Sequence, residues 1–129
     1  MAILHKSLIL TLVLVSTMLF SCSKSSKDPD PQPSAEQLIA DKWWCPSGSY
    51  AQQFFGSDGS WQQRLQTTDT PDTGKWSFSA DKKTINISEV KGGSTPQLFS
   101  QWSYTVNKLE TAALNINYSG LAISYTPCP

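Results

Sequence analysis

Histidine, cysteine and charge are all scarce in this sequence. Its one histidine is His5, near the N-terminus, and charged residues make up only 16% of the 129 positions. The rest of the chain therefore lacks the most common general base, which is also the most common metal ligand. Ten basic residues balance ten acidic ones, so a formal net charge of zero provides no basic surface for nucleic acid. We expect a protein without enzymatic activity, metal, cofactor or nucleic-acid partner.

Carboxylates are the remaining candidates for catalysis or metal binding. Asp58, Asp69, Asp72 and Asp81 fall in predicted turns, where aspartate is favoured because its side chain bonds the nearby backbone. Asp69 and Asp72 together would suit a glycosidase or a calcium site, but the sequence has no multi-ligand calcium loop. We interpret both as residues of a solvated loop and assign no catalytic residue.

The N-terminus has the features of a secretory signal. The run Leu8–Phe20 is almost wholly apolar, but it is too short for a membrane span, which needs about 20 apolar residues. It ends in Leu19-Phe20-Ser21-Cys22, which resembles a lipobox, the motif whose cysteine thiol takes a diacylglycerol. We predict a signal peptide over residues 1–21 and a lipid on Cys22. The alternative is an ordinary cleaved signal with a chance cysteine.

A polar segment follows the predicted lipid site. Residues 22–33 contain no large apolar side chain, so they cannot offset the entropy of ordering and are expected to form a disordered tether. Residue 23 is serine, and the aspartate that retains proteobacterial lipoproteins in the inner membrane is missing. We therefore predict a lipid-anchored protein of the cell envelope, at the outer membrane, on its periplasmic face or at the cell surface. Residues 27–30 resemble the charged surface-export signal of Bacteroidota lipoproteins; the alternative is a solvated linker.

Two cysteines remain once Cys22 is assigned to lipid. Cys45 and Cys128 lie near the two ends of the remaining segment, 34–129. In an oxidising compartment a pair of this kind is expected to form a disulfide. The alternative is two free thiols.

Segment 34–129 reads as one domain of short strands behind a short helix. Ser34 and Gln37 form a capping box that opens a helix through about Ala40. Alternation with a period of two residues dominates the rest, and turn residues separate the runs. The strands are predicted near 42–46, 50–56, 60–67, 74–79, 83–90, 98–107, 111–118 and 121–126.

Regular short strands with tight turns are typical of a barrel or a sandwich. The pattern predicts an all-β fold, a small antiparallel barrel or sandwich of about eight strands. Because proline cannot donate a strand hydrogen bond, Pro46 shortens the first strand, and a β-sandwich or an incompletely closed barrel is the alternative.

Four short motifs occur in order over about residues 38–126. They are Trp43-Trp44, Phe55-Gly56-Ser57-Asp58-Gly59, Gly74-Lys75-Trp76-Ser77-Phe78 and Lys83-Thr84-Ile85-Asn86-Ile87. Together they resemble the lipocalin-like domains of small Bacteroidota lipoproteins. The resemblance implies a small up-and-down β-barrel of about eight strands entered by a short helix.

Aromatic side chains dominate the faces predicted to point inward. An eight-stranded barrel is just wide enough for its own side chains or one small ligand, so a filled core is favoured over a ligand-lined cup. Gln63, on the face of Trp61 and Leu65, is an inward amide that needs a partner. It is the best candidate for a polar contact with a ligand, and the alternative is an amide near the rim bonded to water. The candidate ligand-binding residues are Trp61, Gln63, Trp102, Tyr104 and Tyr118, with Trp76 on the same inward faces.

Adjacent residues of a strand point to opposite faces, so one of Trp43 and Trp44 is expected outside, as a stacking platform or beneath the helix. Two functions stay open. One is a lipoprotein that binds a small hydrophobic or amphipathic ligand at the barrel mouth, which requires an open interior. The other is an interaction protein of the envelope with a filled barrel, such as a partner of a glycan-uptake complex or a peptidase inhibitor.

Overall fold

The computed structural model describes residues 30–93 and 99–129. The predicted signal peptide, Cys22 and most of the predicted tether lie outside these residues. One compact unit, Gln32–Pro129, contains the helix and all the described strands. No helix within the described ranges has both the length and the apolar composition to cross a membrane.

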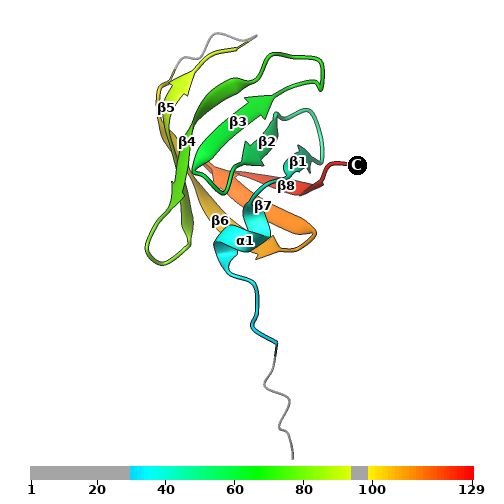
Figure 1. Ribbon diagram of the computed structural model, residues 1–129. Helices are drawn as coiled ribbons and strands as arrows, with labels where there is room; N and C mark the ends of the chain where they lie inside the picture. The colour runs from blue at the N-terminus through cyan, green and yellow to red at the C-terminus, as the bar shows by residue number, and fades with distance from the viewer. Residues whose placement is uncertain (1–29, 94–98) are drawn as a thin grey trace, which may run out of the picture. The chain divides into compact units, whose positions relative to one another are not determined.

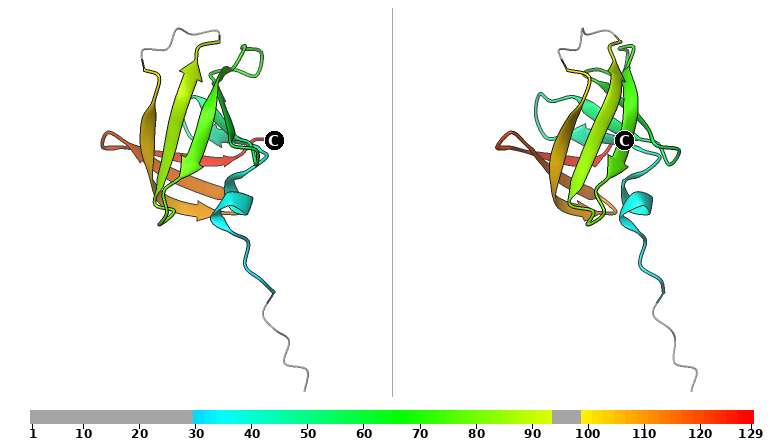
Figure 2. Two further views of the ribbon diagram at one scale, coloured as in Figure 1. Left: turned by 60° about the vertical axis from the view of Figure 1, so that its left-hand side comes forward. Right: turned by 90° about the vertical axis from the view of Figure 1, so that its left-hand side faces the viewer.

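The unit is a closed antiparallel barrel in which each strand pairs with the next and β8 returns to β1 (Figures 1 and 2). The predicted all-β up-and-down barrel is therefore confirmed. The structure is neither a β-sandwich nor an incompletely closed barrel. The elements are α1 (Ala35–Ile39), β1 (Trp43–Pro46), β2 (Gln52–Phe55), β3 (Ser60–Arg64), β4 (Asp72–Phe78), β5 (Thr84–Lys91), β6 (Trp102–Glu110), β7 (Ala113–Tyr118) and β8 (Leu121–Pro127).

The short helix α1 is fixed at both of its ends. The predicted capping box is present: Gln37 N donates to the Ser34 hydroxyl, and Ser34 N donates to Gln37 Oε1. At the other end Ile39 is fully buried, and its carbonyl accepts a 2.9 Å hydrogen bond from Trp44 Nε1. Trp44 is thus the inward member of the tryptophan pair, and it ties α1 to the barrel.

The barrel closes at the seam between β1 and β8. Pro46 is the last residue of β1 and pairs with Tyr125, so the proline shortens the strand without preventing closure. The predicted disulfide joins Cys45 to Cys128, whose Cα atoms are 4.9 Å apart. Next to it, Cys128 N donates to the Trp43 carbonyl at 2.8 Å. A covalent bond and a short ladder therefore hold the same seam.

Inward side chains fill much of the barrel. Alternation along β7 buries Leu114 and Ile116 completely, and Ile123 of β8 packs with them. Such alternation is what a strand with one buried face requires. The buried hydrophobic residues form one cluster: Ile39, Trp44, Phe55, Trp61, Ile85, Ile87, Tyr104, Leu114, Ile116, Ile123 and Tyr125.

Several strand boundaries differ from the prediction, and those of β6 and β4 bear most on the interior. Strand β6 was expected over 98–107 but runs from Trp102 to Glu110, and position 98 lies outside the described residues. The placement of Asp72 in a solvated turn was wrong, because β4 begins at Asp72 and the residue is only 5% exposed. The pairing of β4 with β5 shifts between Thr73 and Lys75, and the backbone comes close enough there that a Cβ on Gly74 would lie 2.8 Å from the Ser88 carbonyl oxygen.

The up-and-down topology sorts the connections into two ends. The connections β2–β3, β4–β5 and β6–β7 meet at the end where α1 packs, which we call the helix end (Figure 1). The connections β1–β2, β3–β4, β5–β6 and β7–β8 meet at the opposite end, which we call the loop end. The two ends differ in their side chains: carboxylates and aromatic rings line a pocket at the helix end, and large apolar side chains are exposed at the loop end.

Candidate functional site

The predicted ligand-binding aromatics lie in one series inside the barrel. Ring centroids are 5.2 Å apart between Trp61 and Trp102, 6.4 Å between Trp102 and Tyr104, and 5.7 Å between Tyr104 and Tyr118. Each pair meets edge to face, the geometry that aromatic quadrupoles favour. Trp61 and Tyr104 are buried, while Trp102 and Tyr118 are partly buried against the core. Because β6 begins and β7 ends at the loop end, the series leads toward that end.

A chain of polar side chains runs beside the aromatic series. Trp61 Nε1 donates to Gln53 Oε1 at 2.8 Å, and Gln53 Nε2 donates to Gln63 Oε1 at 3.3 Å. Gln63 Nε2 then donates to Asp72 Oδ2 at 3.1 Å, and Gly93 N donates to Asp72 Oδ1 at 2.7 Å. The structure thus brings all five candidate residues together, and it gives the Gln63 amide two protein partners.

Sequence reasoning missed Gln53 and Asp72, the two buried polar residues among those described. The signal for Asp72 was its alternation with Gly74, Trp76 and Phe78 along β4, which places it on the inward face. The signal for Gln53 was its place two residues before the buried Phe55. Turn propensity obscured the first signal, because aspartate beside proline and threonine is typical of loops.

Burial also controls two tyrosine hydroxyls in this interior. Desolvation raises the pKa of Tyr125 to about 12, and it raises the pKa of Tyr104 further. A hydrogen bond with the Gln53 side chain acts in the opposite direction on both. Both hydroxyls are therefore neutral near pH 7, each with one proton to donate and lone pairs to accept.

Apolar side chains stand exposed on three connections of the loop end and directly after the fourth. We call this set the apolar rim: Tyr50 in β1–β2, Leu65 in β3–β4, Phe99 in β5–β6 and Leu121 at the start of β8. The expected inward position of Leu65 was wrong, since the side chain is 59% exposed. Leu65 points out because β3 ends at Arg64.

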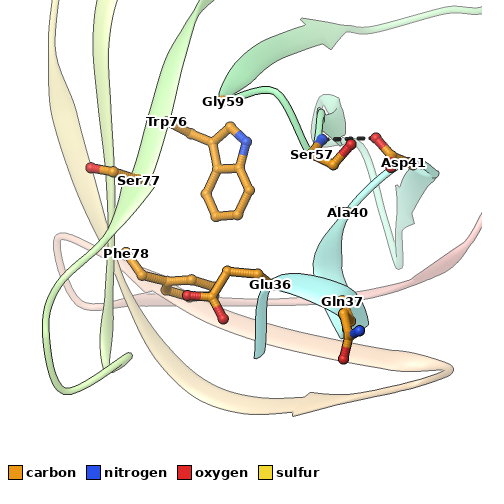
Figure 3. Close-up of a pocket in the computed structure, with 9 residues that line it drawn as sticks. All are labelled: Glu36, Gln37, Ala40, Asp41, Ser57, Gly59, Trp76, Ser77 and Phe78. Atoms are coloured by element: carbon orange, nitrogen blue, oxygen red, sulfur yellow. Dashed lines mark hydrogen bonds between the residues drawn. The ribbon is translucent and has the colours of Figure 1, made fainter. Parts of the chain in front are cut away.

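The helix end holds a pocket of about 520 Å³ between α1, the β2–β3 hairpin and β4 (Figure 3). Trp76 and Phe78 form one wall, and Asp41 and Ser57 stand across from them. Ser57 N donates to Asp41 Oδ1 at 2.8 Å, which fastens the chain after α1 to the hairpin. The lining residues are Glu36, Gln37, Ala40, Asp41, Ser57, Gly59, Trp76, Ser77 and Phe78.

Trp43 is the outward member of the tryptophan pair. Its ring lies 5.5 Å from that of Phe54, and the Arg64 guanidinium carbon lies 3.9 Å from its centroid. Arg64 is held there by its Nε, which donates to Gln52 Oε1 at 3.0 Å. The predicted exposed stacking platform is thus already stacked by the chain's own arginine.

Fold and site together define a small closed β-barrel with a polar and aromatic interior. Comparison of the chain with models of known protein families, with curated proteins and with solved structures finds no match. The likeness to lipocalin-like lipoproteins therefore rests on the sequence motifs, which the barrel carries in β1, in the β2–β3 hairpin, in β4 and at the start of β5.

Proposed function

We propose that the chain is a non-enzymatic lipoprotein of the cell envelope, anchored through Cys22, whose barrel binds a small hydrophobic or amphipathic ligand at the loop end. The observation that carries the proposal is the apolar rim. Three of its members stand on connections that meet at this end, beyond the interior polar chain, and Leu121 begins β8 directly after the fourth connection. Large apolar side chains that gather in one exposed region favour a binding site there.

The chemistry of this end suits a ligand with two different parts. Apolar segments would cover the rim, where each buried apolar side chain contributes about 1.5–3 kcal/mol. A polar group would meet the amide of Gln63 and the hydroxyl of Tyr118, two half-buried side chains. A few placed polar groups within an aromatic lining are what fix orientation in small-molecule sites.

The anchor proposed from the lipobox is compatible with a site at the loop end. The chain enters the domain through α1, so the proposed tether joins the domain at the end opposite the apolar rim. The outer membrane remains the proposed location, and the periplasmic face and the cell surface suit the site equally.

One observation favours a second candidate function. Bulky side chains already occupy much of the interior, and Trp44, Phe55 and Trp61 are fully buried within it. A filled barrel would use the same apolar rim against a protein of the envelope in place of a small ligand. Both candidate functions use the apolar rim. They differ in whether a small molecule or a protein of the envelope binds there.

A paired variant of the apolar rim tests the proposal. The domain 34–129 is titrated with a dansyl-labelled alkyl amide, and energy transfer from tryptophan reports binding. Replacing Leu65 and Phe99 by serine removes apolar contact area, and we expect at least tenfold weaker binding. The matched control replaces the exposed Thr111 and Ala112 of the β6–β7 turn by serine and should bind as the parent does. Equal affinity of both variants would refute the site, and no binding by the parent would favour the second candidate.

A further inference from the structure

We propose that the helix-end pocket is a second binding site, and that it takes the ammonium group of a small organic amine. The proposal is independent of the ligand proposed for the loop end, because the two sites lie at opposite ends of the barrel. Three observations support the proposal. The pocket has an aromatic wall and an acidic wall, a lysine of the chain already contacts one carboxylate and one aromatic ring there, and a second carboxylate and aromatic ring in the lining have no cation beside them among the described residues.

The walls of the pocket are an aromatic face and an acidic face. Trp76 and Phe78 project from β4 on one side, and Glu36 and Asp41 stand on the side of α1 (Figure 3). Aromatic faces carry partial negative charge and attract cations, as carboxylates do. The combination favours a cation that also has an apolar part, and it disfavours an anion.

The protein's own Lys82 already binds at one side of this pocket. Its Nζ pairs with Glu36 Oε1 and lies 5.7 Å from the centroid of the Phe78 ring. The pairing also lowers the pKa of the Glu36 carboxyl. An ammonium between a carboxylate and an aromatic ring is thus a contact that this pocket makes.

Trp76 and Asp41 supply the same two kinds of group elsewhere in the lining, and among the described residues no cation–π contact involves Trp76. Within residues 30–93 and 99–129, the ion pairs of the chain do not include Asp41. Its Oδ1 accepts from Ser57 N, and Oδ2 has lone pairs left for a further donor. Indole is the aromatic group that binds cations most strongly. An ammonium between Asp41 and Trp76 would meet the same two kinds of group that hold Lys82.

The tryptophan wall is rigid before any ligand arrives. Trp76 Nε1 donates to the Gly56 carbonyl at 2.8 Å, and the indole packs edge to face on Phe55 and Phe78 at 5.4 and 5.3 Å. Preorganised groups lose little entropy on binding. A volume of about 520 Å³ falls within the range of small-molecule sites, so the occupant we assign is a small amine with a short apolar tail.

Three probes with one tail and different head groups test the assignment. The full-length chain, in nonionic detergent, is titrated with 2-phenylethylammonium, 2-phenylethanol and 3-phenylpropanoate while the indole N–H signal of Trp76 is followed by ¹H–¹⁵N NMR. We expect a saturable shift with the ammonium, at least fivefold weaker binding of the alcohol and no binding of the carboxylate. The proposal is overturned if the ammonium leaves the Trp76 signal unchanged, or if the alcohol binds as well.

Two variants should move the affinity in opposite directions. Asp41→Asn removes the charge but keeps an acceptor for Ser57 N and tolerates the left-handed backbone at this position, where φ is 57°. It should raise the Kd of the ammonium probe roughly tenfold. Lys82→Gln frees Glu36 and should lower the Kd roughly threefold.

Asp69→Asn is the matched control, because it makes the same change of charge at the loop end, and its Kd should equal that of the parent. An unchanged Kd in Asp41→Asn, or weaker binding in Lys82→Gln, would show that these groups do not hold the ammonium. Neither outcome would bear on the ligand proposed for the loop end.

Discussion

Removing the Cys45–Cys128 disulfide should cost the domain a large part of its stability. The bond spans a sequence separation of 83 residues, so it encloses nearly the whole barrel in one covalent loop. We consider the variants Cys45→Ala and Cys128→Ala, singly and together. Each of them opens that loop completely.

The magnitude follows from the length of the loop. For 83 residues the chain-entropy relation gives a loss of about 4.5 kcal/mol at 25 °C. The whole stability of a domain of this size is about 5–15 kcal/mol, so about 30% of it or more depends on the bond. The ladder at the seam does not compensate, because only three residue pairs join β1 to β8.

Urea unfolding at pH 7 measures the loss. We expect the midpoint to fall by roughly 2–4 M for each single variant, and the double variant to lose no more than a single one, because both changes remove the same bond. A loss below about 1 kcal/mol in the single variants would refute the reasoning. So would a double variant whose loss equals the sum of the two single losses.

Three further perturbations address the interior. Gln53→Leu leaves the Trp61 indole N–H without its acceptor and should cost about 1–3 kcal/mol in urea unfolding; no loss would mean that the polar chain is not structural. Gly74→Ala places a Cβ 2.8 Å from the Ser88 carbonyl oxygen and should cost about 1–3 kcal/mol by the same assay; a neutral result would contradict this close backbone approach. Because burial raises the pKa of Tyr125 to about 12, the unfolded chain loses this proton first. Stability present below pH 10 should therefore fall by about 3 kcal/mol as the pH rises from about 10 to 12, and Tyr125→Phe, followed by urea unfolding against pH, should lack this part of the fall.

The strands were predictable where a local pattern determines them. Strands β7 and β8 alternate, with Leu114 and Ile116 inward and Asn115 on the other face, so which residues share a face follows from the sequence alone. Strand β1 was harder, because Pro46 is compatible with both an open and a closed barrel. The pairing of Pro46 with Tyr125 closes the barrel, and this contact joins residues that are distant in sequence.

The polar interior could be predicted only in part. Gln63 was recognised as an inward amide, but its partners come from β2 and β4, and one of them is an aspartate that local propensity places in a turn. The helix-end pocket was not predicted, since it depends on where α1 settles. That position is fixed by burial of Ile39 and by the bond from Trp44, neither of which a residue pattern encodes.

The division between the ends of the barrel explains how a small core could coexist with the proposed binding surface. Toward the helix end the interior is packed by apolar side chains such as Ile39 and Phe55, which supply stability. Toward the loop end lie the amides, the partly buried Trp102 and Tyr118, and the apolar rim. Binding surfaces are commonly placed on connections held by a rigid scaffold.

The central claim is that the loop end holds a small molecule, and native mass spectrometry tests it most directly. The domain 34–129 would be purified gently from the periplasm of its own host, beside the variant in which Leu65 and Phe99 are replaced by serine. We predict an added mass on the parent that organic extraction removes and that the variant lacks. A parent whose mass equals that of the polypeptide alone would contradict the claim.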